Sequence, residues 1–199
     1  MTDRRIEKGK ATRGRLLDAG RLLFGERGYE ATSIDAILRE AGVAKGALYH
    51  HFEDKQQLFD AVLDRTLAEI AGRIAEVARA GEDALANLRA GCDAWLEMAL
   101  DPEIQRIAIL DPPTAVGWAR GRELDELHAL GGVRAALLQL AEDDRVPPGQ
   151  VDALSHMVLA AVNEAALMIV RADDQQAALA AGSAAVDTLL GRLAGSADD

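Results

Sequence analysis

The chain has 199 residues, of which 49% are hydrophobic and 4% aromatic, and its formal net charge is −11. This length is sufficient for one or two domains with a substantial core. The single cysteine, Cys92, excludes an intramolecular disulfide and fits a reducing compartment. Alanine and leucine dominate, and apolar residues recur every three or four positions, so we expect an all-α fold.

The N-terminal end is basic although the whole chain is acidic. Residues 1–55 hold eleven Lys/Arg and nine Asp/Glu, a net charge of +2, and residues 56–199 have a net charge of −13. The first fifteen residues alone have a net charge of +4, from Arg4, Arg5, Lys8, Lys10, Arg13 and Arg15 against two acidic residues. Such a tail suits the phosphates of DNA, and the alternative is a solvated, disordered end; both hold if the tail orders only on DNA.

Residues 32–58 predict two short helices around a glycine turn, followed by the start of a third helix. Thr32 and Ser33 offer side-chain oxygens to the free N–H groups of a helix start, and Gly42 can adopt the left-handed conformation that ends the helix. Asp54 is expected to cap the next helix, with Gln57 three residues later. This arrangement is a helix-turn-helix and predicts binding to DNA.

The second short helix of this motif, expected over residues 45–51, is too short to be stable alone. Leu48 is expected to face inward, whereas Lys45, Gly46, Tyr49 and His50 face elsewhere. A polar and glycine-containing face suits the major groove, where glycine allows close approach and Lys or Tyr reaches phosphates and base edges.

The sequences TRGRLLDAGRLLFGERGYEATSI and AGVAKGALYHHFEDKQQLF resemble the N-terminal DNA-binding domain of the TetR family of bacterial transcriptional regulators, over roughly residues 10–60. The resemblance implies a DNA-binding domain over residues 1–55 and a helical ligand-binding and dimerisation domain over residues 56–199. Ala44 and Ala47 stand where the family often has Ser or Thr. The DNA-contacting positions that it implies are Thr32, Ser33, Ala44, Lys45, Gly46, Ala47, Tyr49, His50 and Lys55.

Beyond this motif the pattern predicts further helices separated by glycine and proline. A long helix over 54–80 ends at Gly81, and Gly131–Gly132 is a possible interruption of a later helix. The remaining helices are expected over 82–100, from 102 to 110, over 114–142, over 151–171 and over 173–194, with loops at 111–113 and 147–149.

The last two helices are apolar on more than one side, which predicts burial on more than one side. Alanine-rich faces permit close helix approach, so two such helices from each of two protomers are expected to form a four-helix interface. The resemblance implies the same homodimer, whereas the alternative is packing wholly within one chain. A twofold dimer predicts a pseudo-palindromic operator with half-sites roughly 34–36 Å apart.

A small-molecule effector is implied by the resemblance, and the middle of the chain offers residues for its pocket. Apolar walls are available from Trp95, Met98, Trp118 and Met157, and polar groups from Arg106, His128, Asn163 and Glu164. The alternative for each is an ordinary place in the core or on the surface, since Trp and Met at helical spacing are typical of a core.

Other classes of function have little support. The four histidines at 50, 51, 128 and 156 have no paired cysteines and no HExxH spacing, so we expect no metal, and we expect neither a cofactor nor catalysis. We expect no apolar run as long as the ~18 to 20 residues that a membrane span needs, and we expect a cytoplasmic protein. A helical dimer that binds small molecules or proteins without DNA stays open, but it leaves the residues from Lys45 to Lys55 unexplained.

Overall fold

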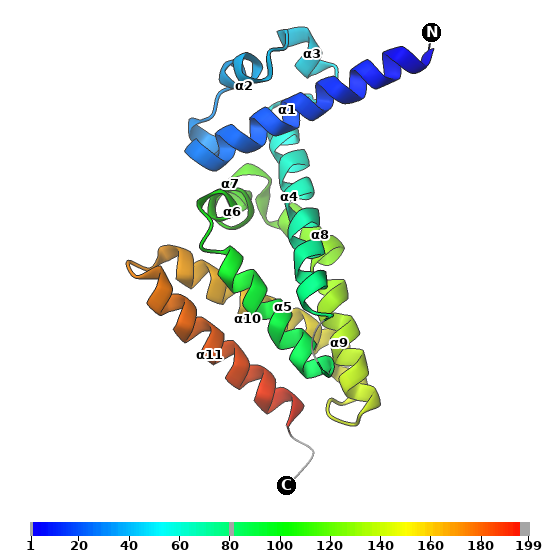
Figure 1. Cartoon of the computed structure of the whole chain (residues 1–199), viewed down its shortest axis with the longest axis vertical. Helices are drawn as coiled ribbons and strands as arrows, with labels where there is room; N and C mark the ends of the chain where they lie inside the picture. The colour runs from blue at the N-terminus through cyan, green and yellow to red at the C-terminus, as the bar shows by residue number, and fades with distance from the viewer. Residues whose placement is uncertain (1, 80–81, 196–199) are drawn as a thin grey trace. The chain divides into compact units, whose positions relative to one another are not determined.

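The computed structural model describes residues 2–79 and 82–195. Every regular element in these ranges is a helix, which confirms the expected all-α fold (Figure 1). The elements are α1 (Thr2–Ala31), α2 (Ile34–Ala41), α3 (Lys45–Tyr49), α4 (Lys55–Val77), α5 (Ala84–Met98), α6 (Pro102–Ile104), the π-helix η1 (Gln105–Leu110), α7 (Pro112–Ala115), α8 (Gly117–His128), α9 (Leu130–Glu142), the 3₁₀-helix η2 (Pro148–Gln150), α10 (Val151–Arg171) and α11 (Gln175–Ala194).

The chain divides into two compact units that do not follow the expected boundary at residue 55. One unit comprises residues 1–66 together with 102–121, and the other comprises 67–101 together with 122–199. The helix α4 is continuous through the change from the first unit to the second, between Thr66 and Leu67. The division into a DNA-binding part and a ligand-binding part stays a prediction about function.

The core of the first unit joins α1, α2, α3 and the beginning of α4. Leu16, Phe24, Ile37, Leu48 and Phe59 are each fully buried, and they come from all four helices. The rings of Phe24 and Phe59 meet edge to face with centroids 5.1 Å apart, a preferred geometry for aromatic pairs. Packing of this kind stabilises helices that are too short to form alone.

Residues 102–121 belong to the same unit because α6 and η1 pack along α1. The approach is close at Gly25, where an added Cβ would lie 2.8 Å from Cγ of Glu103. A side chain at this position would therefore force Glu103 of α6 to shift. The sequence pattern predicted a helix ending at residue 110 but gave no sign that it packs on the DNA-binding helices.

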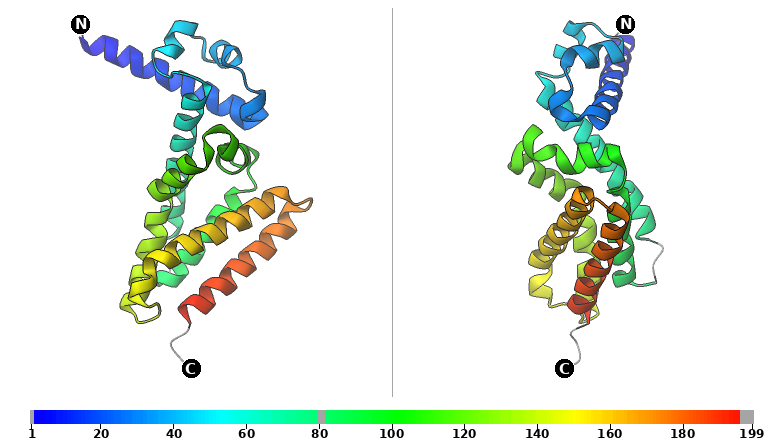
Figure 2. Two further views of the ribbon diagram at one scale, coloured as in Figure 1. Left: turned by 180° about the vertical axis from the view of Figure 1, so that it is seen from behind. Right: turned by 90° about the vertical axis from the view of Figure 1, so that its left-hand side faces the viewer.

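The second unit is a bundle in which α10 packs against α5, α9 and α11, and α5 also packs against α9 and α11. In Figure 2 both views show α10 and α11 side by side along their lengths. Its core includes Leu88 and Leu96 of α5, Leu137 of α9, Val162 of α10 and Leu190 of α11. Cys92 is also buried there, as expected for a core residue.

Most helix boundaries lie within a few residues of the expected ones, and α10 matches 151–171 fully. The break within 114–142 was misplaced: the chain interrupts at Gly117, where φ is +81°, and at Ala129, while Gly131–Gly132 lie inside α9. The stop expected at Gly81 lies outside the described residues. The basic tail is helical from Thr2 onward in place of a disordered end.

The expectation that no segment resembles a membrane span is wrong by length and composition. Residues 148–171 and 175–194 are helical, and in each an 18-residue window reaches a mean hydropathy of 1.7 and 1.2, respectively. Both segments are long and apolar enough to cross a bilayer. Only 33% and 17% of these windows are buried within the chain. Two such helices are weak evidence for a membrane, and their exposed apolar faces require another explanation.

Candidate nucleic-acid interface

The helix α2 is well defined at both ends. Ser33 is its N-cap, with Oγ accepting a hydrogen bond from the Ala36 N–H at 3.2 Å. Gly42 ends the helix in the left-handed conformation (φ +61°, ψ +40°), as predicted, and Val43 N–H donates to the Leu38 carbonyl at 3.2 Å. These bonds satisfy backbone groups that a helix end otherwise leaves unpaired.

The side chain of Thr32 is buried and bonded to the backbone of α1. Its side chain is 1% exposed, and its hydroxyl donates to the carbonyls of Gly28 at 2.7 Å and Leu23 at 3.1 Å. This corrects the prediction that Thr32 contacts DNA, because its hydroxyl is buried and already bonded to the backbone of α1. Ser33, the next residue, is exposed.

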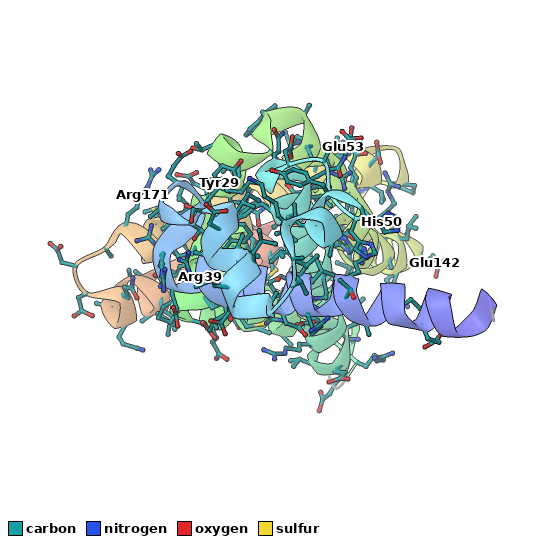
Figure 3. All side chains as sticks on the ribbon, turned by 90° about the horizontal axis from the view of Figure 1, so that it is seen from above. Tyr29, Arg39, His50, Glu53, Glu142 and Arg171 are labelled. Atoms are coloured by element: carbon teal, nitrogen blue, oxygen red, sulfur yellow. The ribbon has the colours of Figure 1, made fainter. Side chains whose placement is uncertain are left out.

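The short helix α3 is anchored on one side and open on the other. Leu48 is fully buried, whereas Ala44, Lys45, Gly46 and His50 are exposed and Tyr49 is 50% exposed. Ala47 is half-buried. Figure 3 looks onto this part of the unit and labels Arg39 on α2 and His50 at the end of α3. The residues expected to contact DNA, other than Thr32, Ala47 and Lys55, therefore lie on an exposed surface, which we call the α3 face.

His51 lies against His50 of the α3 face, and Arg13 of α1 lies close to His51. The rings of His50 and His51 meet edge to face with centroids 5.0 Å apart. The guanidinium of Arg13, from α1, lies 5.4 Å from the centroid of the Phe52 ring. Burial lowers the pKa of His51, and the neighbouring His50 and Arg13 lower it further. His51 is therefore mostly neutral at pH 7, whereas Arg13 and Lys45 carry fixed positive charges in this region.

The start of α4 carries the predicted cap. The Asp54 carboxylate accepts from the Gln57 N–H at 2.7 Å, and the Gln57 side-chain oxygen accepts from the Glu53 N–H at 2.9 Å. Lys55 is half-buried, and its ammonium donates to the Tyr29 carbonyl at 2.9 Å. One of its three donors is thus used inside the protein, and the role of the others toward a phosphate stays a prediction.

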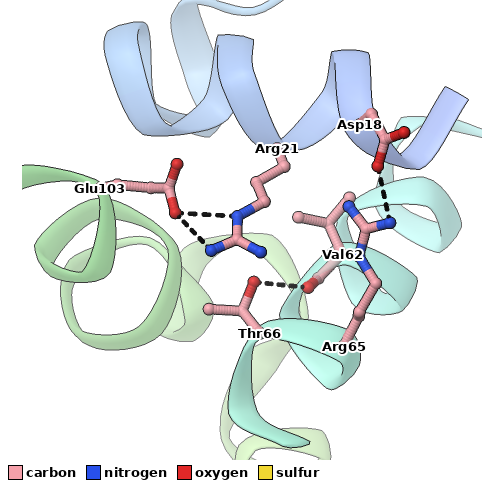
Figure 4. Close-up of polar contacts among 6 residues, drawn as sticks. All are labelled: Asp18, Arg21, Val62, Arg65, Thr66 and Glu103. Carbon is pink, nitrogen blue, oxygen red and sulfur yellow. Dashed lines mark hydrogen bonds and ion pairs between the residues drawn. The ribbon is translucent and has the colours of Figure 1, made fainter. Parts of the chain in front are cut away.

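Ion pairs join α1 to α4 and to α6 (Figure 4). Arg21 donates through Nε to the Glu103 carboxylate at 2.8 Å, and Arg65 Nη1 lies 2.8 Å from the Asp18 carboxylate. Arg120 and Asp60 form a further pair with two hydrogen bonds of 2.7 and 3.2 Å. These contacts tie α1, α4 and residues 102–121 together in one unit.

The eight residues expected to line a ligand pocket are divided between the two units. Arg106 and Trp118 belong to the first unit, and the other six belong to the second. Trp118 on α8 is 79% exposed. On α10, Met157 is 66% exposed and Glu164 is also exposed. This corrects the prediction that Trp118 and Met157 form apolar wall. Trp95, Met98, His128 and Asn163 are half-buried in the second unit.

Trp95 has an additional property that the sequence did not show. Its indole Nε1 is buried and has no hydrogen-bond partner among the described residues. A buried donor without an acceptor costs about 1–3 kcal/mol, so a ligand that supplies an acceptor would gain from this site.

Within residues 2–79 and 82–195, no group of three or more His, Cys, Asp or Glu side chains is placed to hold a metal ion. His156 lies with Nδ1 3.3 Å from Arg122 Nη2.

Sequence reasoning missed the contacts that Arg13 and Asp111 make within the first unit. Arg13 was noted only as part of a basic tail, and Asp111 was noted only as part of a loop, yet its carboxylate accepts from the Tyr29 N–H at 2.6 Å. The pairing joins residues 82 positions apart. The only local signal is Gly28, a glycine late in a helical pattern, which indicates a break without indicating its partner.

An all-α chain with a capped α2, a glycine turn and an outward-facing α3 defines a helix-turn-helix DNA-binding protein. Comparison with known families agrees. Residues 16–62 match the model described as bacterial regulatory proteins, tetR family. Residues 85–193 match the tetracyclin repressor-like C-terminal domain. The chain belongs to the TetR family, and it is a ligand-responsive DNA-binding transcriptional regulator.

Individual relatives support the assignment. The transposon Tn10 TetC protein of Escherichia coli is 30% identical over 154 residues, which is 76% of this chain and 77% of that protein. The transcriptional repressor KstR2 of Rhodococcus jostii is 37% identical over 97 residues, about half of each chain. A TetR-family regulator from Pectobacterium atrosepticum has a crystal structure with a TM-score of 0.83 and 36% identity, covering 94% of this chain and 96% of that chain.

Proposed function

We propose that the protein is a dimeric repressor that binds a pseudo-palindromic operator through the α3 face and is released by a small molecule. The observation that carries the DNA-binding part is the orientation of α3. Leu48 fixes the helix on the core, and Lys45, Gly46, Tyr49 and His50 are left exposed. A short helix held in this way is suited to enter a major groove.

The proposed contacts divide by chemistry. Lys45 and the remaining donors of Lys55 bind phosphates, which position the protein without reading sequence. Tyr49 and His50 reach base edges, and Gly46 and Ala47 allow the backbone to approach. Ser33 and Ala44 flank the groove from the ends of α2 and α3. Arg13 adds charge beside α3, in agreement with the basic N-terminal region.

Homodimerisation through α10 and α11 explains their exposed apolar faces. Met157, Met168 and Leu189 are 66%, 64% and 42% exposed. Exposed alanines lie on the same two helices at positions 153, 160, 177, 180, 181, 184 and 185. Large contiguous apolar surfaces of this kind mark association sites, and small residues permit close helix approach. A second copy of the chain covers these faces in the proposal, so a membrane is not required.

The effector is proposed to bind in the second unit, near Trp95, Met98, His128 and Asn163. Distant relatives with the same fold have been solved with small molecules: FadR of Bacillus subtilis with stearoyl-CoA, at 20% identity, and RolR with resorcinol, at 21% identity. A ligand weakens operator binding only by as much as it prefers the conformer that does not bind DNA. Each tenfold loss of operator affinity requires a preference of about 1.4 kcal/mol. The continuous helix α4 connects the two units along the chain.

A second class of function stays as the alternative, a helical dimer that binds small molecules or proteins without DNA. It uses the same α10 and α11 but gives no role to the exposed side chains of α3. A cytoplasmic location is proposed because the family acts on bacterial DNA.

Selection of duplexes from a random pool by the purified full-length protein tests the proposal. We expect enrichment of a pseudo-palindrome whose half-site centres are about one helical turn apart, 10–10.5 base pairs, or a multiple of it. Genome-wide mapping of bound sites then identifies the regulated genes, and the neighbouring genes suggest candidate effectors. A pool that shows no enrichment would favour the alternative.

A further inference from the structure

The backbone N–H and the backbone carbonyl of Tyr29 are both held by side chains from distant parts of the chain. Its N–H donates to the Asp111 carboxylate at 2.6 Å. Its carbonyl accepts from the Lys55 ammonium at 2.9 Å, and that ammonium also lies 4.1 Å from the centroid of the Tyr29 ring. Hydrogen bonds that involve charged groups are about twice as strong as neutral ones. The backbone of this one residue therefore links residues 102–121 to the start of α4.

Asp111 acts where α1 departs from helical geometry. Gly28 has φ +81° and ψ +167°, a conformation that is strained for any residue with a side chain. A Cβ at Gly28 would lie 3.2 Å from Oδ2 of Asp111 and 3.4 Å from Nη1 of Arg106. Directly after this break, the Tyr29 N–H donates to the Asp111 carboxylate.

The position of Asp111 is set by the π-helix η1. The Asp111 N–H donates to the Arg106 carbonyl at 3.1 Å, five residues earlier, which closes the last wide turn of η1. A π-turn carries one more residue than an α-turn, and such turns occur frequently at functional sites. Rewinding η1 as an α-helix would rotate Asp111 away from Tyr29.

The break at Gly28 in turn sets the start of the helix-turn-helix. The Thr32 hydroxyl donates to the Gly28 carbonyl at 2.7 Å, and the Thr32 N–H donates to the Tyr29 carbonyl at 3.3 Å. Thr32 immediately precedes Ser33, the N-cap of α2. Every contact in this chain of bonds lies within the first unit.

We propose that Asp111 is a positioning residue for the α3 face, and that residues 102–121 adjust DNA affinity through its bond to the Tyr29 N–H. The inference rests on the proposed function and specifies how it is regulated. Asp111 itself does not touch DNA in this account. Loss of its carboxylate releases the break at Gly28, and α2 and α3 then lose their fixed placement on α1.

The test compares three variants of the full-length protein on a duplex selected by the wild type from a random pool. Asp111→Ala should weaken binding about tenfold, the equivalent of 1.4 kcal/mol, without changing the slope of log affinity against log salt. Asp111→Asn retains an acceptor oxygen and should restore affinity to within about threefold. Glu103→Gln is the matched control, since it breaks the Arg21 ion pair between the same two segments but leaves Tyr29 alone.

Fluorescence anisotropy gives the affinities, and thermal unfolding of each variant ensures that all are measured while folded. Wild-type affinity in Asp111→Ala would overturn the inference, as would an equal loss in Glu103→Gln or a failure of Asp111→Asn to restore binding. These outcomes differ from failure of the proposed function, in which the wild type itself selects no duplex.

Discussion

The ammonium of Lys55 donates to the Tyr29 carbonyl at 2.9 Å and lies 4.1 Å from the centroid of the same residue's ring. A lysine at the start of α4 thus stabilises the end of α1, in addition to the phosphate contact proposed for its other donors. The two roles have different experimental signatures, because an internal bond affects stability and a phosphate contact affects salt dependence.

Lys55→Met tests both roles. Loss of the hydrogen bond and of the contact with the ring should lower the free energy of unfolding by about 1–3 kcal/mol, measured by urea titration. Operator binding should weaken on all sequences, and the slope of log affinity against log salt should fall by about one unit. An unchanged slope would restrict Lys55 to its internal role.

Leu48→Ala should detach α3 from the core. Leu48 is fully buried, so its truncation should lower the free energy of unfolding by about 2–5 kcal/mol. Operator affinity should fall further than stability alone explains, because α3 has no other fully buried side chain to fix its orientation. Titration with the selected duplex, well below the unfolding temperature, measures the affinity of the variant. Wild-type affinity in Leu48→Ala would show that α3 needs no buried anchor.

Met157→Glu tests the proposed dimer. Met157 is 66% exposed on α10, so a charge there should leave the fold of the chain intact but oppose burial against a second copy. Light scattering should show a monomer, and operator affinity should fall because the two half-sites are no longer bound by one linked pair. The matched control is Leu138→Glu on α9, a residue that is 50% exposed and lies outside α10 and α11. If both variants stay dimeric, the interface lies elsewhere.

Cys92 should be chemically inert in the folded protein. Burial raises the pKa of its thiol to about 12, and the nearby Asp93 adds to the shift. The thiolate is the reactive form, so a thiol reagent at pH 8 should modify the native protein slowly and the urea-unfolded protein rapidly. The folded pKa exceeds the unfolded value of 9.0, so folding favours the neutral thiol, and this stabilisation is lost as the pH rises from about 9 toward 12. Rapid labelling of the native protein would contradict the prediction that Cys92 is buried and unreactive.

Local patterns predicted the parts of the fold that depend on neighbouring residues. The cap at Ser33, the left-handed Gly42, the Asp54–Gln57 box and the bounds of α10 follow from backbone hydrogen bonds and helical periodicity within a few positions. The inward side chain of Leu48 followed from the same periodicity.

Long-range packing was not predictable in the same way. The placement of residues 102–121 on α1 depends on Glu103 and Asp111, which pair with residues 82 positions earlier. The resemblance to the TetR family implied that Thr32 contacts DNA, but its hydroxyl is buried and bonded to the backbone of α1. Trp118 and Met157 were expected inside because apolar periodicity does not separate a core from an association surface.

The central claim is that the α3 face contacts DNA, and the most direct test is the affinity of Tyr49→Ala and Lys45→Ala for the selected duplex across a range of salt concentrations. Both variants should bind at least about tenfold more weakly, with a salt slope lower by about one unit for Lys45→Ala and unchanged for Tyr49→Ala. Leu127→Ala, at a residue 67% exposed on α8, should bind as the wild type does. Wild-type affinity in both α3 variants would contradict the account.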